Sequence, residues 1–172
     1  MAKVGFIMGD VFEDSEFKVP YEAVKVAGHE AVVIGTMKGK KLEGKNGEEA
    51  VTTDASVSEV DAGSLDALVI PGGYSPDKIR TDAGMVELTR SMVASGKPVA
   101  AICHAGWMLA EAGILAGKTV TSWPSIKTDL VNAGANWVDQ EVVEDGNLIT
   151  SRKPDDLDAF TKTLLSQMEQ SA

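Results

Sequence analysis

The sequence predicts an α/β fold, in which a mostly parallel sheet carries helices on both faces. Short apolar runs alternate along the chain with segments whose apolar residues recur at helical spacing. Glycine or proline lies at many of the boundaries between these segments. The length of 172 residues is enough to bury a full-sized core, so we expect a single domain over residues 1–172.

The strands are predicted from short apolar runs that end near turn-forming residues. They are expected at residues 3–8, 30–34, 65–70, 99–102, 119–122, 138–143 and 148–151. Residues 36–50 are rich in lysine and glycine, which indicates a surface hairpin rather than a buried strand.

The first helix is predicted over residues 12–27, because Phe17, Tyr21 and Val24 recur at helical spacing and Gly28 is a natural stop. Pro154 is well placed in the first turn of the last helix. The other helical segments are a short helix and turn at 57–65 and helices at 84–95, from Cys103 to about 112, at 124–133 and at 154–168.

Composition and charge limit the classes of partner. The formal net charge is −10 and the pI is about 4.6, so phosphate backbones and anionic lipid would repel the chain, and we expect no nucleic-acid or membrane partner. The longest apolar stretches, such as residues 98–110, are too short to span a bilayer. A strand so close to the first residue leaves no room for a signal peptide, so we expect a cytoplasmic protein.

Cys103 is the single cysteine, which excludes an intramolecular disulfide and a cysteine-based zinc site; we expect no cofactor. An apolar strand ends at this residue and a helical pattern follows, with Ala101, Ala105 and Gly106 as small neighbours. That pattern is typical of a nucleophile elbow, a strained turn that exposes a reactive side chain. The following helix would favour the thiolate, which is the form that attacks carbonyl carbon. The alternative is a buried structural cysteine.

Two further loops are expected at the carboxyl ends of the strands, where active sites lie in such sheets. They span residues 9–15 and 71–75. Paired glycines at Gly72 and Gly73 allow a close backbone approach, so the N–H groups of Gly73 and His104 are candidates for an oxyanion hole. An ordinary tight turn is the alternative for the glycine pair.

Three acids begin the first helix. Asp14 and Glu16 fit the ordinary role of carboxylates that complement the helix dipole. Glu13 differs if the strand order brings it to Cys103, because like-charge repulsion would then keep it protonated as a hydrogen-bond donor and proton shuttle.

Histidine is scarce. His29 lies at a helix-to-strand turn, at the opposite end of the predicted sheet, and is expected to be structural or exposed. His104 follows Cys103 directly, and adjacent side chains in such a turn tend to diverge. Asp77, from another subunit, would be able to orient His104, although capping a helix after Pro76 is the simpler role for it.

Five ordered motifs carry a family resemblance. They are residues 12–16 (FEDSE), 70–73 (IPGG), 101–106 (AICHAG), 132–139 (NAGANWVD) and 150–157 (TSRKPDDL). The chain resembles, over about residues 3–165, the PfpI family of intracellular cysteine peptidases and bacterial general stress proteins. That family belongs to the class I glutamine amidotransferase-like superfamily, together with the parkinsonism-associated deglycase.

The resemblance implies a flavodoxin-like three-layer sandwich that assembles into homodimers or larger homo-oligomers. It implies Cys103 as the nucleophile, Glu13 as its carboxyl partner, and Gly73 and His104 as N–H donors to an oxyanion. In the peptidase interpretation His104 is the base, and the acid at the position of Asp77 comes from a neighbouring subunit.

The chain departs from the family pattern in places. Ala105 and Gly106 replace the usual Gly-Pro, Asp77 replaces a glutamate, and Trp123 replaces a common aromatic hydroxyl. No histidine follows His104, which excludes the downstream His-x-Glu pair of glutamine amidotransferases.

We therefore predict a stress-related cysteine-nucleophile hydrolase, formally a peptidase, in which the Cys103 thiolate attacks a carbonyl carbon, and two alternatives stay open beside it. The first alternative is a glyoxalase or deglycase, in which the sulfur adds to a small methylglyoxal-type carbonyl and Glu13 moves protons. The second is a non-enzymatic redox sensor or chaperone that uses oxidation of Cys103.

Overall fold

The computed structural model describes residues 1–171 and has an α/β architecture, as predicted. Seven strands form the central sheet, in the order β10-β11-β7-β6-β1-β2-β5. All neighbouring strands are parallel except β10, which pairs antiparallel with β11 at one edge. The strands are β1 (Lys3–Ile7), β2 (Glu30–Gly35), β5 (Ala55–Ser56), β6 (Ala67–Ile70), β7 (Val99–Ile102), β10 (Val143–Asp145) and β11 (Leu148–Ser151).

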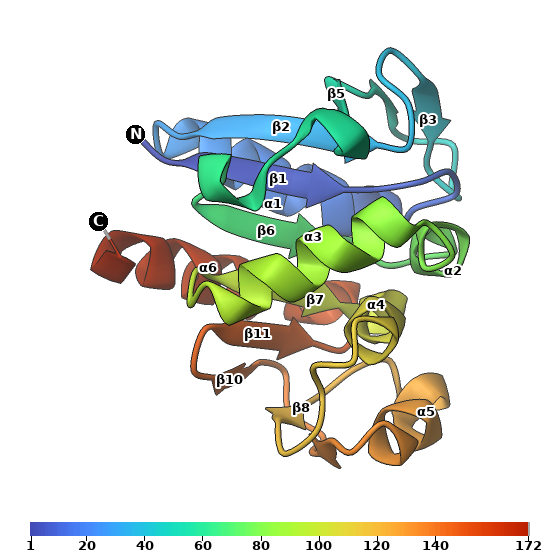
Figure 1. The fold of residues 1–172 in the computed structure, drawn as a ribbon, viewed down its shortest axis with the longest axis vertical. Helices are drawn as coiled ribbons and strands as arrows, with labels where there is room; N and C mark the ends of the chain where they lie inside the picture. The colour runs from blue at the N-terminus through green and yellow to red at the C-terminus, as the bar shows by residue number, and fades with distance from the viewer. Residues whose placement is uncertain (172) are drawn as a thin grey trace.

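Helices cover both faces of this sheet (Figure 1). The helices α1 (Asp14–Val26) and α6 (Leu157–Ser171) lie behind the sheet in this view, and α3 (Ala83–Ala94) and α4 (Gly106–Glu111) lie in front. Each layer buries its own apolar cluster against the sheet. Phe6, Phe17 and Phe160 belong to the first cluster, and Leu68, Met85 and Leu109 belong to the second.

The predicted surface hairpin is present, although its strands are shorter than the segment suggested. It consists of β3 (Lys41–Glu43) and β4 (Ala50–Thr52), which pair with each other and not with the central sheet. Residues 44–49, called the hairpin tip below, connect the two strands and fold back towards α1.

The predictions fail mainly where elements are short. The strand expected at 138–143 is wrong: β9 (Asn136–Trp137) pairs with β8 (Thr119–Val120) in a separate small sheet, and β10 begins only at Val143. Residues 57–65 form two single 3₁₀ turns, Val57–Glu59 and Ala62–Ser64, instead of a short helix. Ser56 and Asp61 cap the start of each turn, but the backbone becomes extended again at Val60 and at Leu65, so neither turn continues into a helix.

Two short helices complete the chain. The sequence indicated a helix after Pro76 only as a capping role for Asp77; the helix there, α2 (Ser75–Ile79), begins after Tyr74, and Asp77 lies in its first turn without capping it. The helix expected at 124–133 is a 3₁₀ turn at Pro124–Ile126 followed by α5 (Lys127–Asn132), and a similar turn, Pro154–Asp156, precedes α6. Within residues 1–171, no helix is both long and apolar enough to cross a membrane.

Candidate active site

The three predicted loops meet at the carboxyl ends of β1, β6 and β7. Phe12 and Gly73 form an isolated antiparallel bridge, and the N–H of Glu13 donates to the carbonyl of Gly72 at 3.1 Å. A Cβ placed on Gly72 would lie 2.8 Å from the Cβ of Cys103. The first and second loops therefore pack directly against the third, and the glycine pair is required for that close approach.

Cys103 has the strained backbone that the sequence indicated. Its φ is +62°, in the left-handed region, where a residue with a side chain costs about 1–3 kcal/mol. The turn at Cys103–Ala105 ends β7 and leads into α4. Val11, in the first loop, also has a positive φ of +60°, which is a clear outlier for a β-branched residue. Backbone strain is thus concentrated in the two loops that flank the glycine pair.

The sulfur of Cys103 receives two backbone hydrogen bonds, from the N–H groups of Gly73 and His104, and both favour its ionised form. Gly73 has a φ of +79°, and a Cβ there would overlap the backbone of Glu13. The side chain of Cys103 is almost fully buried, with 6 % exposed. Burial first, and the charge of Glu16 second, raise the pKa of Cys103 to about 12. Burial therefore opposes the resting thiolate that the sequence led us to expect.

Glu16, not Glu13, is the carboxyl group that contacts the sulfur. Glu16 is fully buried, and its Oε1 accepts the N–H of Gly72 at 2.9 Å. Its Oε2 is buried without a nitrogen or oxygen donor, and a hydrogen bond with Cys103 is among the smaller influences on its pKa. The expectation that Glu16 only complements the helix dipole is wrong, because the helix turns this side chain inward.

Burial, followed by the charge of Glu13, raises the pKa of Glu16 to about 8. Glu16 is therefore protonated at neutral pH, and its charge then no longer opposes ionisation of Cys103. The Oε2 of Glu16 accepts no hydrogen bond, so leaving it charged would carry the free-energy cost of an unpaired buried carboxylate oxygen. A proton on this oxygen removes that cost and provides an O–H donor beside the sulfur.

Glu13 lies next to this cluster but is held by other groups. It is buried, with 8 % exposed, and its Oε2 forms an ion pair of 2.7 Å with Lys45. Its Oε1 accepts from Asn46 at 3.2 Å and from Ser15 at 3.3 Å. The predicted pairing of Glu13 with Cys103 is absent from the contacts of residues 1–171, although the charge of Glu13 acts on Glu16.

His104 is the second side chain at the sulfur. Contrary to the expected divergence, its Nδ1 lies 3.2 Å from the sulfur of Cys103, and its Nε2 lies 3.4 Å from the hydroxyl of Ser125. Its ring contacts those of Trp107 and Trp123. Burial, and then the charge of Lys45, lower the pKa of His104, so the imidazole is neutral at pH 7. In the described part of the chain, no carboxylate contacts the ring.

Asp77 does not reach His104 within one chain. It lies in α2, its side chain is exposed, and it forms no hydrogen bond or ion pair with the imidazole in residues 1–171. His29 accepts the backbone N–H of Ala2 at 3.0 Å at the other end of β1, in agreement with the structural role expected for it.

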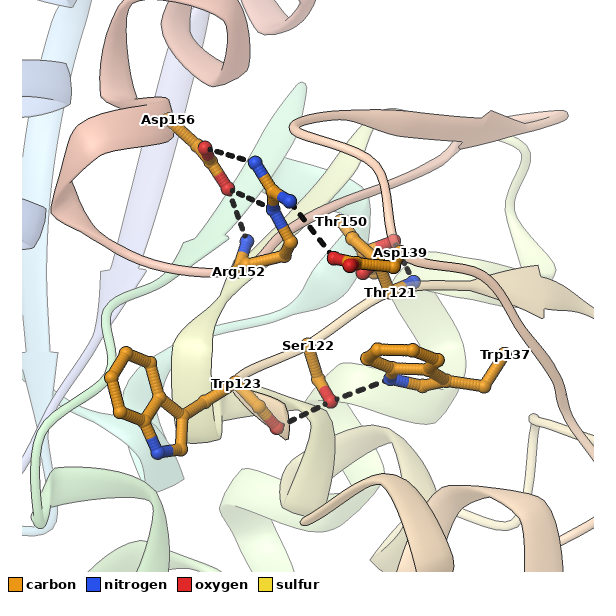
Figure 2. Close-up of polar contacts among 8 residues, drawn as sticks. All are labelled: Thr121, Ser122, Trp123, Trp137, Asp139, Thr150, Arg152 and Asp156. Atoms are coloured by element: carbon orange, nitrogen blue, oxygen red, sulfur yellow. Dashed lines mark hydrogen bonds and ion pairs between the residues drawn. The ribbon is translucent and has the colours of Figure 1, made fainter. Parts of the chain in front are cut away.

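Trp123 is fixed beside His104 by a short chain of hydrogen bonds (Figure 2). The backbone N–H of Trp123 donates to the carbonyl of Cys103 at 3.2 Å, and the backbone carbonyl of Trp123 accepts a hydrogen bond from the hydroxyl of Ser122 at 2.9 Å. The indole of Trp137 donates to the same hydroxyl at 3.0 Å. These bonds hold the side chain of Trp123 close to the strained turn at Cys103.

The last two sequence motifs are joined around Arg152 (Figure 2). The guanidinium donates to both carboxylate oxygens of Asp156, at 2.9 and 3.0 Å, and to Asp139 at 2.8 Å. Asp156 is buried, so this arginine neutralises it, whereas Asp139 is mostly exposed. The motifs at 132–139 and 150–157 thus stabilise the fold rather than contact the sulfur.

The site thus combines a strained cysteine, a paired-glycine loop and a buried glutamate. The model of a known protein family matches residues 2–167 of the chain, which shows the family. The chain belongs to the DJ-1/PfpI family. It is 45 % identical to General stress protein 18 of Bacillus subtilis over 97 % of this chain and 98 % of that protein. It is 47 % identical to Protein/nucleic acid deglycase 2 of Escherichia coli over 95 % of each chain. It is 44 % identical to YraA of Bacillus subtilis, which is named as a candidate cysteine protease, over 97 % of this chain and 98 % of that one.

Solved structures of DJ-1/PfpI proteins have the same fold. A two-domain protein from Anabaena variabilis, with a DJ-1/ThiJ/PfpI-like and a ferritin-like domain, matches with a TM-score of 0.97 and 41 % identity. The match covers 98 % of this chain and 48 % of that longer one. DJ-1beta of Drosophila melanogaster matches with a TM-score of 0.88 and 31 % identity over 99 % of this chain and 95 % of that one. The predicted flavodoxin-like sandwich is confirmed.

The sequence contained a signal for Glu16 that spacing alone makes visible. Glu16 and Phe17 precede Pro20 and Val24 by helical intervals, and all four are buried on one stripe of α1. An acid on an apolar stripe is a stronger candidate for a buried site than one that only begins a helix.

Proposed function

We propose that this chain is a stress-related cysteine-nucleophile hydrolase of the PfpI type that acts on reactive aldehydes, or on their early adducts with amines, as a deglycase. The observation that carries the proposal is the buried Glu16 beside Cys103. A carboxyl group that keeps its proton to about pH 8 can donate to a substrate oxygen and later take a proton back. The relatives named as deglycases support the same substrate class.

In the proposed reaction, the turn at Cys103 acts as a nucleophile elbow. The thiol of Cys103 gives its proton to the neutral His104, 3.2 Å away, as the sulfur forms a bond to the aldehyde carbon of a 2-oxoaldehyde and the carbonyl electron pair moves to the oxygen. The N–H groups of Gly73 and His104, which already point at the sulfur, would hold that oxygen, and Glu16 would protonate it.

The remaining steps need only proton transfer and water. Glu16, now a carboxylate, takes the hydrogen on the attacked carbon as a proton and returns it to the neighbouring carbonyl carbon. The hydroxyl proton of the attacked carbon moves to the neighbouring carbonyl oxygen, which gives a 2-hydroxy thioester. Water cleaves the thioester, releases a 2-hydroxy acid and restores the thiol. Where the aldehyde carbon already carries an amine as a carbinolamine, the carbon–sulfur bond replaces the carbon–nitrogen bond, and the amine leaves with a proton from Glu16, which gives the same hemithioacetal.

The peptidase function is the second candidate, and one observation favours it: His104 is within 3.2 Å of the sulfur. Peptide cleavage, however, needs a general acid for the leaving amine, and His104 has no carboxylate partner in residues 1–171 to orient it. Because Asp77 is exposed on α2, a second copy of the chain would have to supply it in a homodimer or larger homo-oligomer. Aldehydes are better electrophiles than amides and do not require this arrangement.

The remaining expectations extend the same proposal. We propose a single PfpI-like domain over residues 1–172, a cytoplasmic location and a small carbonyl compound or a peptide as substrate. The net charge of −10 argues against nucleic acid and membrane partners. Oxidation of Cys103 as a redox sensor is the outcome to consider if no substrate turns over.

The experiment follows methylglyoxal consumption and lactate formation with the wild type, Cys103→Ser, Glu16→Gln and Glu13→Gln. We expect Cys103→Ser and Glu16→Gln to lose at least about 100-fold in turnover, the usual scale for an acid–base group. Glu13→Gln should retain most of it, because glutamine still offers an oxygen to Lys45.

Casein-type substrates and Asp77→Ala test the second candidate. Cleavage of casein by the wild type that disappears in Asp77→Ala, together with no lactate formation, would replace the deglycase by the peptidase. Loss in Glu13→Gln but not in Glu16→Gln would return the shuttle role to Glu13.

A further inference from the structure

The hairpin tip is anchored to the start of α1 by a buried carboxylate. Asp14 is 1 % exposed, and its two oxygens accept three backbone N–H groups, from Asn46 at 2.9 Å, Glu48 at 3.0 Å and Glu49 at 2.9 Å. Burial acts to raise the pKa of Asp14, but these backbone donors outweigh it and lower the pKa. Asp14 is thus a charged anchor for the hairpin tip. The sequence position suggested only that it complements the helix dipole.

Backbone contacts complete the attachment. The N–H of Lys45 donates to the carbonyl of Phe12 at 2.8 Å, and Val11 donates to Glu43 at 2.8 Å. Gly44 lies so close that a Cβ on it would overlap the carboxylate of Asp14. The tip is therefore held in a fixed position over the loop that precedes α1.

This attachment directs Lys45 towards the catalytic cluster. Its ammonium forms the 2.7 Å ion pair with Glu13, and Asn46, the next residue of the tip, holds the other oxygen of the same carboxylate. The backbone N–H of Glu13 in turn donates to the carbonyl of Gly72, and the N–H of the next residue, Gly73, faces the sulfur. Glu13 thus bridges the tip and the site.

We propose that the Asp14-anchored hairpin tip is a positioning device that holds the Lys45 ammonium on Glu13, next to the loop that contacts Cys103, from where its charge stabilises negative charge on the sulfur. Glu13 holds the ammonium in place. The role of this positioning in catalysis rests on the proposed function, whereas the effect of Lys45 on ionisation of the Cys103 thiol does not.

The charges that face Cys103 agree with this assignment. They come from Glu16 on α1, from Glu13 through its effect on Glu16, from Lys45 on the tip, and from His104, which is neutral at pH 7. Lys45 is the cation among them: its charge lowers the pKa values of Cys103 and of Glu16. The hydrogen bond from Lys45 to Glu13 is the main cause that raises the pKa of Lys45; burial lowers it, and the charges of Glu13, Cys103 and Glu16 raise it further.

The experiment measures the rate at which iodoacetamide alkylates Cys103 between pH 6 and 11, which requires no turnover. This range lies below the thiol pKa of about 12, so the rate at each pH reports the small fraction of thiolate. Because Cys103 is the single cysteine, mass spectrometry of the intact protein reports on this thiol alone. We expect Lys45→Met to slow alkylation about tenfold at each pH in this range, because loss of the cation raises the thiol pKa. Lys45→Arg should stay within about twofold of the wild type, because it keeps the charge.

Two more variants separate position from charge. Lys41→Met is the matched control: this lysine is in the same hairpin but exposed, paired only with Glu43 at 3.6 Å, and should alkylate like the wild type. Asp14→Asn weakens the anchor and should slow alkylation as Lys45→Met does, with no further slowing when the two are combined.

Alkylation of Lys45→Met at the wild-type rate across the pH range would overturn the proposal, as would a Lys45→Arg profile that matches Lys45→Met. Where Asp14→Asn does not fold, the two Lys45 variants still decide. A wild type that turns over no aldehyde would refute the proposed function while leaving the alkylation result intact.

Discussion

Gly72 is the position at which one added methyl group should disable the site. Its φ lies in the ordinary range, so Gly72→Ala adds no backbone strain, but the new Cβ would overlap Oε1 of Glu16 and lie 2.8 Å from the Cβ of Cys103. It would also lie 2.9 Å from the carbonyl oxygen of Ile102. These neighbours are backbone or buried, so the clash must be relieved by moving the Glu16 carboxyl away from the sulfur.

The expected cost combines two effects. Overpacking a core by a methyl group costs about 1–3 kcal/mol. Losing the hydrogen bond from the N–H of Gly72 to Glu16 adds about 1–2 kcal/mol. The sum of about 2–5 kcal/mol should lower the melting temperature by about 5–15 °C for a chain of this size.

Gly63→Ala is the matched control for this prediction. Its φ is also ordinary, and its added Cβ would meet only Asp61, at 3.6 Å, which is normal van der Waals contact. Differential scanning calorimetry should show a change of less than about 3 °C for Gly63→Ala, with methylglyoxal turnover retained. Equal melting temperatures and equal turnover in the two variants would refute the reasoning that Gly72 exists to let Glu16 approach Cys103.

Three further predictions follow from the titratable groups. Because burial raises the pKa of Glu16 from 4.5 to about 8, the folded state binds more protons than the unfolded state in that range, so this group's contribution to stability falls as pH rises from about 4.5 to 8. Glu16→Gln has no such pH-dependent loss of stability. In urea titrations, the unfolding free energy of this variant minus that of the wild type should therefore rise between pH 4.5 and 8. A difference that stays constant over this range would contradict a buried, protonated Glu16. The lowered pKa of His104 should give an imidazole titration midpoint below 6.5 in NMR spectra, and Lys45→Met should move that midpoint upwards; a wild-type midpoint above 6.5 would contradict the assignment. Arg152→Ala leaves the buried Asp156 unpaired and should cost about 2–4 kcal/mol in urea unfolding, whereas Asp139→Asn at the exposed end of the same arginine should cost less than about 1 kcal/mol; similar costs for both would show that burial of Asp156 is not what matters.

The alternation of apolar runs and helical patterns was enough to predict the parallel sheet, because right-handed crossovers leave few other arrangements. It was also enough to place Gly73 and Cys103 at the same edge of the sheet, but only the observed order, with β6 beside β7, brings the two loops into contact. Short elements were the weak point: α2 and the β8–β9 pair have too few residues to show a period.

The sequence by itself determined that a cysteine lies at a sharp strand end, at the same edge of the sheet as a glycine loop and a cluster of acids. Only the tertiary structure decided which acid reaches the sulfur. Glu13 and Glu16 are one helical turn apart, and the packing of Phe17, Pro20 and Val24 against the sheet sets the rotation of α1 that turns Glu16 inward and leaves Glu13 to Lys45. The hairpin tip was equally hidden, because a contact between Asp14 and backbone N–H groups more than thirty residues away leaves no local pattern in the chain.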